Sequence, residues 1–402
     1  MCVRGGLALA LLTLSAAAAA QIVVPPLGGV VNTVGGITNQ VLEPVESVSA
    51  NATRLARSRI DRLAGLVRNN ADRIEFDAAR QPARRGELLI VDPAPAALDR
   101  ARAAGFEVVE QGSIAGLDLG FARLAVPAGQ SLASAERALR KLLPAAQITA
   151  DQLHFTAGGA ARGATAAPAR AIPRGGTVGV IDGGVAAGPL IAAQAGFANG
   201  APRANGHAQA IASLLGGAGA ARVLVADVYG NDPAGGNALA IARALGWMAQ
   251  QNVPVVSISL VGPANPLIER AIGAVRARGI VVVAAVGNDG AAAPPAYPAS
   301  YPGVIAVTGV DRNLRALFEA GRAAHLDYAA PGADMTAIGL GGQRIALRGT
   351  SYAAPLVALR LAALRAAGAD PRSMIARADA EATRGGSRTG RGVLCGACRT
   401  GI

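Results

Sequence analysis

The sequence has few of the residues on which several protein classes depend. Three cysteines and three histidines in 402 residues exclude disulfide-dense scaffolds and multi-zinc architectures. Aromatic residues make up 3%, too few for a module that binds nucleic acid by stacking on its bases. Charged residues make up 16% and hydrophobic residues 51%. The chain is therefore not a disordered polyelectrolyte, and it is long enough to build a large core.

Lysine is also nearly absent: Lys141 is the single one, and arginine carries almost all of the net charge of +12. Such a charge attracts nucleic acid or anionic surfaces, and a basic nucleic-acid binder is one alternative that it raises. The arginines are dispersed among alanines, however, and form no long basic block. We therefore favour arginines on solvated faces and expect no nucleic-acid partner.

The N-terminus has the pattern of a secretory signal. Arg4 is the only charge in the first 42 residues, an apolar run covers residues 7–14, and Ala18-x-Ala20 fits a small-residue cleavage site. The run is shorter than the roughly 20 residues that a membrane span needs. The sequence predicts a signal peptide over residues 1–20, export to the periplasm or the medium, and no membrane span in the mature form.

Three segments precede the main domain. Residues 21–85 combine a stretch rich in glycine and valine with an arginine-rich helix that has a solvated polar face. Residues 86–155 alternate as β-α-β-β-α-β, the order of a small α+β unit of the ferredoxin-like kind. Residues 156–173 contain mainly alanine, glycine, arginine and proline without periodicity, and we expect an exposed, flexible linker.

The pattern over residues 174–368 predicts an α/β domain with an open, mostly parallel, doubly wound sheet. Helical segments alternate with continuous apolar runs, such as residues 281–285, that suit strands covered on both faces. Functional groups in such sheets gather at the carboxyl ends of the strands. Residues 369–402 form a C-terminal tail, in which Cys395 and Cys398 are expected to form a disulfide; a redox motif and half a zinc site are the alternatives.

Two side chains in this region suit acid–base chemistry, although neither is specific alone. Asp182 ends the first predicted strand and could equally bind a ribose or a phosphate, or cap a turn. His207 opens a predicted helix. The other two histidines, His154 and His325, lie in strand-like segments with no carboxylate or cysteine pattern nearby, and we expect them to be structural.

Ser351 lies in a Gly-Thr-Ser-x-Ala-Ala-Pro segment. Gly349 allows a tight approach, and Pro355 is tolerated only near the beginning of a helix. Ser351 is therefore expected at a helix N-terminus, where unpaired backbone N–H groups point outward. That position suits both a nucleophile and an oxyanion site.

These motifs together resemble the subtilisin-like serine proteases (subtilases, peptidase family S8). The resemblance rests on the Ser351 motif, on Ile-Asp-Gly-Gly-Val around Asp182 and on Gly-His at His207, and it covers residues 175–368. The order Asp, His, Ser is also that of the family. It implies a serine endopeptidase that hydrolyses polypeptides through these three residues and an acyl-enzyme, without a cofactor.

The resemblance assigns further residues. Asn288, at the end of a buried strand, takes the place of the oxyanion-binding amide. The residues that it places at the substrate are Ser259, Leu260, Gly262, Ala284 and Ala285. The first three would pair with an extended peptide by strand addition, and the alanines would leave room for a large apolar side chain.

Residues 86–155 are similar in pattern and position to subtilase propeptides, which implies a proenzyme whose own N-terminal unit is its partner. The chain departs from the family at Gly183, where threonine or serine is usual, and at Ala208-Gln209, where Gly-Thr is usual. These departures leave one alternative, a weak or inactive peptide-binding protein on the same scaffold. No aspartate-rich calcium loop is present, so no metal site is expected.

Overall fold

The computed structural model describes residues 39–157, 159–162 and 175–399. Two compact units are distinguished, Met1–Val48 and Ser49–Ile402. In the first, the described part is the beginning of helix α1 (Asn39–Asn69), and all that follows concerns the second. The predicted signal peptide and most of the stretch rich in glycine and valine lie outside the described residues.

An α+β unit (residues 74–152) follows α1, and its elements from β2 to β5 have the β-α-β-β-α-β order that the sequence predicts. Its antiparallel sheet has the order β5-β2-β4-β3, and β1 also pairs with β2. The elements are β1 (Ile74–Phe76), β2 (Pro82–Val91), α2 (Pro95–Ala103), β3 (Glu107–Ser113), β4 (Gly120–Ala125), α3 (Leu132–Leu142) and β5 (Gln147–Gln152).

The two faces of this sheet have different partners because side chains alternate along a strand. Leu88 and Ile90 of β2 pack against α2 and α3. Leu89 and Val91 belong instead to a cluster that includes helices of the following domain. The unit therefore has one face for its own core and one for docking.

The arginine-rich helix differs from its predicted extent. It begins at Asn39 and ends at Asn69, so the residues that follow, up to 85, form β1 and the first part of β2 instead. A three-residue strand is too short to show a period of two, and the arginines of β2 mask its alternation.

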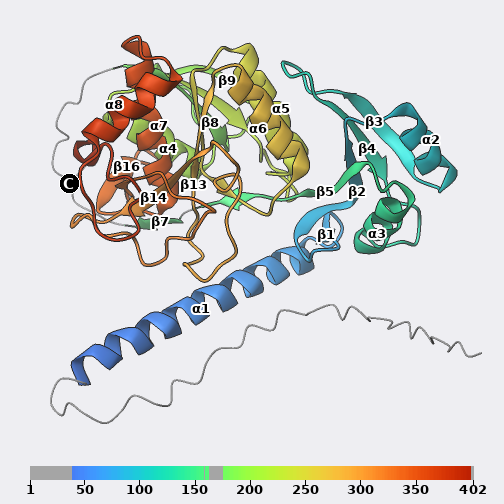
Figure 1. Cartoon of the computed structure of the whole chain (residues 1–402), viewed down its shortest axis with the longest axis horizontal. Helices are drawn as coiled ribbons and strands as arrows, with labels where there is room; N and C mark the ends of the chain where they lie inside the picture. The colour runs from blue at the N-terminus through green and yellow to red at the C-terminus, as the bar shows by residue number, and fades with distance from the viewer. Residues whose placement is uncertain (1–38, 158, 163–174, 400–402) are drawn as a thin grey trace, which may run out of the picture. The chain divides into compact units, whose positions relative to one another are not determined.

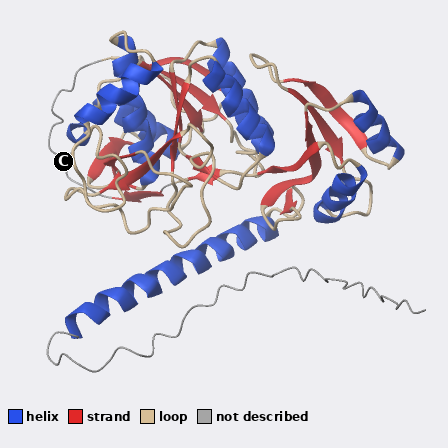
Figure 2. Cartoon of the chain, viewed as in Figure 1, coloured by secondary structure: helices blue, strands red, loops and turns tan. Residues whose placement is uncertain are grey.

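The parallel-sheet domain (residues 175–399) confirms the predicted α/β class (Figures 1 and 2). Its seven strands are all parallel, in the order β15-β14-β13-β11-β8-β10-β9. They are β8 (Thr177–Asp182), β9 (Ile191–Gly196), β10 (Arg222–Asp227), β11 (Val255–Ile258), β13 (Val281–Ala285), β14 (Ile305–Val310) and β15 (Tyr328–Pro331).

Two pairs of helices cover the sheet. α5 (Ala238–Gln250) and α6 (Pro266–Ala277) pack on one face, and α4 (Gly206–Gly217) and α7 (Thr350–Ala366) pack on the other. The chain passes from β8 to β9 and β10 on one side of it and then crosses to β11 on its other side. Such a reversal opens a crevice at the carboxyl ends of the strands, where ligands bind in open α/β sheets.

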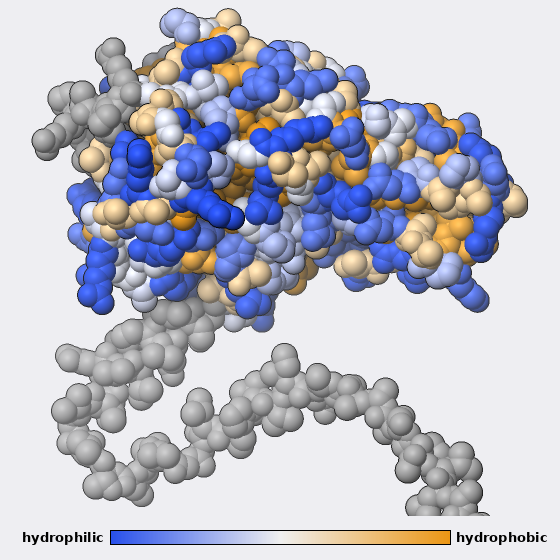
Figure 3. Space-filling model, turned by 45° about the horizontal axis from the view of Figure 1, so that its top comes forward, coloured by the Kyte–Doolittle hydropathy of each residue, from blue (hydrophilic) through white to orange (hydrophobic). Residues whose placement is uncertain are grey.

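The C-terminal residues are part of this domain and not a separate tail. Helix α8 (Pro371–Glu381) packs on α7, and Leu394 and Cys398 lie in the same core cluster. Cys395 and Cys398 form a disulfide, as expected. The surface drawn in Figure 3 mixes hydrophilic and apolar residues. Within the described part of the chain, no helix is both long and apolar enough to span a bilayer.

Candidate active site

Asp182 and His207 are in direct contact. Asp182 is the last residue of β8 and is fully buried, and both of its carboxylate oxygens lie 3.0 Å from Nδ1 of His207. His207 is the second residue of α4, whose N-cap Asn205 accepts a hydrogen bond of 2.8 Å from the backbone N–H of Ala208. The carboxylate therefore fixes the orientation of an imidazole that a rigid helix presents.

Gly183 is required by the packing around this pair. A Cβ at this position would lie 1.7 Å from Nδ2 of Asn205, the residue that caps α4. The backbone N–H of Gly183 also donates to Oδ1 of Asp182 at 2.8 Å. At Gly183, where the family usually has a hydroxyl residue, the Asn205 side chain takes the space that a side chain would need. The Asp182–His207 contact is intact.

Ser351 is the second residue of α7, as its motif predicts. Gly349 precedes the helix with φ of 140°, a conformation that favours glycine. Oγ of Ser351 and Nε2 of His207 are both buried, and neither has a hydrogen-bond partner among the described residues. Catalytic hydrogen bonds are often long in a resting enzyme and tighten when the reacting geometry is reached.

Asn288 and Ser351 converge on one carbonyl oxygen of the chain itself. Asn288 follows β13, and its Nδ2 donates to the carbonyl oxygen of Ala157. The backbone N–H of Ser351 donates to the same oxygen at 3.2 Å. Oδ1 of Asn288 accepts from the N–H of Thr350 at 3.0 Å, which holds the amide in place. Two fixed donors on one carbonyl oxygen are the arrangement that an oxyanion hole requires.

The residues on both sides of Ala157 pair with strand edges of the parallel-sheet domain. Before it, β6 (Phe155–Thr156) pairs antiparallel with β12 (Leu260–Val261), and the N–H of Ala157 donates to the carbonyl of Ser259 at 2.9 Å. After it, β7 (Gly159–Arg162) pairs antiparallel with β17 (Arg344–Arg348). The chain thus lies across the crevice as an extended peptide.

The prediction of an exposed, flexible linker over residues 156–173 is therefore wrong for its first part. The backbone groups there are taken up by strand edges that the local sequence does not reveal. A stretch of alanine and glycine has no side-chain pattern from which such pairing could be inferred. Residues 163–174 lie outside the described residues.

Comparisons with known proteins agree with this geometry. The model of the subtilase family matches residues 174–378. The chain belongs to the subtilase family. It is 32% identical over 197 residues to Subtilisin BL of Lederbergia lenta, which is 45% of this chain and 72% of that protein. It is 36% identical over 132 residues to Subtilisin DY of Bacillus licheniformis, 32% of this chain and 48% of that protein. This subtilase is accordingly a serine-type endopeptidase.

The fold is also similar to a solved structure, fervidolysin from Fervidobacterium pennivorans, described as a keratinolytic enzyme related to subtilisin. The TM-score is 0.63 at 15% identity, over 79% of this chain and 61% of that chain. Identity this low shows the shared fold alone. Among the described residues of the subtilase, no group of three or more His, Cys, Asp or Glu side chains is placed to hold a metal ion.

The residues expected at the substrate divide into two groups. The backbones of Ser259 and Leu260 contact Ala157 and Thr156, and Gly262 leaves room for the ring of His154, since a Cβ there would lie 2.5 Å from it. Ala284 and Ala285, in contrast, are fully buried within β13. Their side chains pack into the two cores that the sheet separates, so they do not line the crevice.

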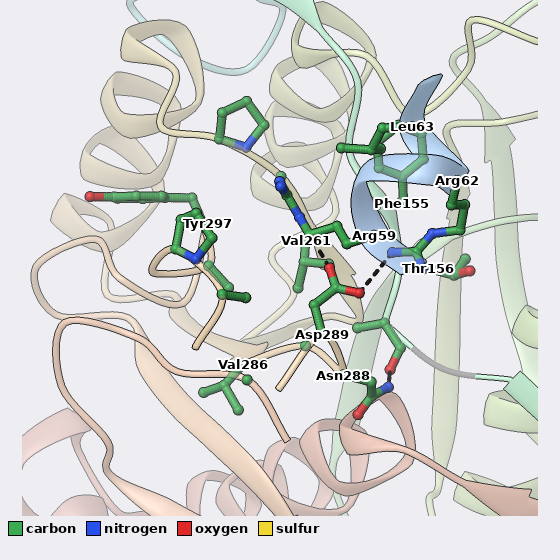
Figure 4. Close-up of a pocket in the computed structure, with 18 of the residues that line it drawn as sticks. Arg59, Arg62, Leu63, Phe155, Thr156, Val261, Val286, Asn288, Asp289 and Tyr297 are labelled. Carbon is green, nitrogen blue, oxygen red and sulfur yellow. Dashed lines mark hydrogen bonds and ion pairs between the residues drawn. The ribbon is translucent and has the colours of Figure 1, made fainter. Parts of the chain in front are cut away.

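The crevice contains residues that the sequence did not single out. A cavity of about 1310 Å³ is lined by Asp289 and Tyr297 among others, and by residues of α1 (Figure 4). The ring of Tyr352 lies 5.6 Å from that of His207, and burial raises the pKa of its hydroxyl. The position of Asp289 directly after Asn288 is the only feature of the sequence that could have predicted its place in the crevice.

The two remaining histidines have structural surroundings. His154 is fully buried beside Gly262, and burial lowers its pKa to about 4. His325 lies with Nε2 2.8 Å from the carbonyl oxygen of Val304 and 3.4 Å from Asp327. The Asp182–His207 hydrogen bonds involve neither of them.

Proposed function

We propose that this subtilase is an exported proenzyme that cleaves its own chain between Ala157 and Gly158 before it hydrolyses other polypeptides. The observation that carries the proposal is the position of the Ala157 carbonyl, which accepts hydrogen bonds from both Ser351 and Asn288. A peptide carbonyl held by these donors, next to the residue that offers the nucleophile, is placed for attack.

The reaction assigns one role to each side chain. Nε2 of His207 removes the proton of the Ser351 hydroxyl, and Oγ attacks the carbonyl carbon of Ala157. His207 then returns the proton to the amide nitrogen of Gly158 as the C–N bond breaks. An ester between Ser351 and Ala157 remains, which water hydrolyses with His207 as the base. Asp182 holds the imidazole and stabilises its charged form, while Asn288 and the Ser351 N–H stabilise the oxyanion.

The docking of the α+β unit supports a proenzyme. Asp151 of β5 accepts a hydrogen bond of 3.0 Å from the N–H of Leu239 at the start of α5. Asn265, the N-cap of α6, donates through Nδ2 to Thr149 at 3.1 Å and to Gln152 at 3.1 Å. The unit therefore contacts the N-termini of two helices of the parallel-sheet domain, through a free N–H group of α5 and through the side chain that caps α6.

Export is the remaining part of the proposal, and it rests on residues 1–20. A single basic residue, an apolar run and Ala18-x-Ala20 together are typical of a secretory signal. An exported location also suits the Cys395–Cys398 disulfide, since such bonds persist in oxidising compartments. We therefore place the mature enzyme in the periplasm or the medium.

The test compares the full chain with Ser351→Ala and with the control Ser373→Ala, which changes a partly exposed serine of α8. We expect the unaltered chain and the control to split into two fragments, to degrade casein and to take up a fluorophosphonate at Ser351. The Ser351→Ala chain should stay uncut and unlabelled. Cleavage of Ser351→Ala at the unaltered rate would exclude self-processing, and absence of labelling in the unaltered chain would exclude the serine mechanism.

A further inference from the structure

The second half of α1 presents one face to the crevice. Leu55, Arg59, Leu63 and Leu66 are spaced by four, four and three residues and so share a side of the helix. Leu63 is buried with 8% of its surface exposed, whereas Ile60, on another side, is 63% exposed. From Leu55 onward, α1 is therefore a packed helix and not a free one.

Two arginines of α1 bind the carboxylate of Asp289. Nε of Arg59 lies 3.3 Å from one oxygen, and a terminal nitrogen of Arg62 donates to the other at 2.7 Å (Figure 4). Leu55 contacts the neighbouring Gly290, where an added Cβ would lie 3.0 Å from it. Asp289 and Gly290 come directly after the oxyanion residue Asn288, so the helix docks at the margin of the candidate active site.

The end of α1 is anchored on both folded parts. Leu66 and Val67 pack against Ile74 and Leu153 of the N-terminal part and against Ala234 of the parallel-sheet domain. The cavity of the crevice is enclosed between residues of α1 and residues that include His207. The helix thus covers the side of the crevice that residues 155–157 occupy.

We propose that α1 is a second inhibitory segment, a basic amphipathic helix that docks on Asp289 and Gly290 and keeps the enzyme latent after the first cut. The inference rests on the proposed cleavage after Ala157. After that cut, α1 and the α+β unit belong to one fragment, so their contacts act together in holding the new end of the chain in the crevice. Losing the α1 contacts speeds dissociation of the fragment.

The first experiment uses Arg59→Ala/Arg62→Ala in the full chain. Its matched control is Arg57→Ala/Arg68→Ala, which removes the same charge from exposed positions of the same helix that make no ion pair with any described residue. All four positions precede the cut, so the catalytic fragment is identical in every protein. The readout is the rate at which each protein hydrolyses a short fluorogenic peptide immediately after self-cleavage. This rate is divided by the number of active sites, which a fluorophosphonate labels once the N-terminal fragment has been digested.

We expect the Arg59/Arg62 variant to hydrolyse the peptide about three- to tenfold faster per site than the unaltered protein, the range that two partly exposed ion pairs allow. The control should stay within about twofold. Added salt should raise the latent activity of the unaltered protein, because it screens these pairs. Equal activity of the Arg59/Arg62 variant and its control would overturn the proposal.

A second experiment does not depend on catalysis and uses the Ser351→Ala chain. Amide hydrogen exchange over residues 55–66 should be faster when Arg59→Ala/Arg62→Ala is added, and unchanged by the control pair. Reversing the charges, with Asp289→Arg combined with Arg59→Asp/Arg62→Asp, should restore protection. If neither the arginine removal nor the charge reversal changes the exchange rate, α1 does not dock through these residues. This outcome can be read even if the proposed peptidase activity fails its own test.

Discussion

The hydroxyl of Ser259 donates a hydrogen bond of 2.8 Å to the carbonyl oxygen of Ser351. Pro355 lies four residues further along α7 and has no N–H, so this carbonyl lacks its donor within the helix. Ser259 takes the place of the missing donor. The beginning of the helix that carries Ser351 is thereby tied to the segment that pairs with residues 155–157.

We predict that Ser259→Ala destabilises the fold by about 1–3 kcal/mol, because it leaves a buried carbonyl without a partner. Ser257→Ala is the matched control, since the hydroxyl of Ser257 is equally buried and has no hydrogen-bond partner to lose. Urea unfolding of both variants in the Ser351→Ala chain measures the difference. Equal losses would show that the Ser259 hydroxyl contributes nothing specific.

Asn288 should be the most sensitive position outside the Asp182, His207 and Ser351 set. Asn288→Asp keeps the oxygen that accepts from Thr350 but replaces the donor to Ala157 with a negative charge. We expect self-cleavage to slow by a factor of about 10² to 10³. Gel analysis of precursor conversion over time gives the rate, and a loss of less than about tenfold would argue against an oxyanion role.

Gly183→Ser introduces the hydroxyl residue that is usual in the family, and here it should be harmful. The new Cβ would meet Asn205, displace the cap of α4 and move His207 away from Asp182. Gly206→Ala is the control, because a Cβ at that glycine meets nothing within 4 Å. Precursor conversion should slow by at least about tenfold in Gly183→Ser alone. Normal conversion of that variant would show that the residues around Gly183 can move apart enough to accept a side chain.

Asp151 makes the docking of the α+β unit dependent on pH. Burial raises the pKa of this carboxyl to about 7, and Glu87 adds to the increase, while the N–H of Leu239 and the charges of Arg84 and Arg123 oppose it. The folded chain thus binds the proton more tightly than an unfolded chain, whose aspartate pKa is about 4. The stabilisation is complete below about pH 4 and is lost as the pH rises through about 7.

The Ser351→Ala chain should therefore lose more stability between about pH 5 and about pH 8 than the same chain with Asp151→Asn, since asparagine still accepts from Leu239 but does not ionise. Denaturant unfolding at the two pH values measures this. Burial lowers the pKa of His154 to about 4, so its contribution to the pH dependence of stability has the opposite sign. His154 is present in both chains, so this contribution cancels in the difference. Identical pH dependence would contradict the assignment to Asp151.

The sequence was sufficient for those features that local pattern encodes. Continuous apolar strands gave the sheet, and the Ser351 motif gave the start of α7, because each depends on residues close together in the chain. The position of the Ala157 carbonyl between Asn288 and Ser351 depends instead on two strand edges far away in sequence. Alanines 284 and 285 were misplaced because a buried strand and a pocket wall both favour small apolar residues.

The bond that is cut can be located by measuring the intact masses of the two fragments, together with N-terminal sequencing of the larger one. We predict a catalytic fragment that begins at Gly158 and an N-terminal fragment that ends at Ala157, both absent from Ser351→Ala. A first cut elsewhere, such as within residues 163–174, would contradict the assignment of the Ala157 carbonyl as the group that Ser351 attacks.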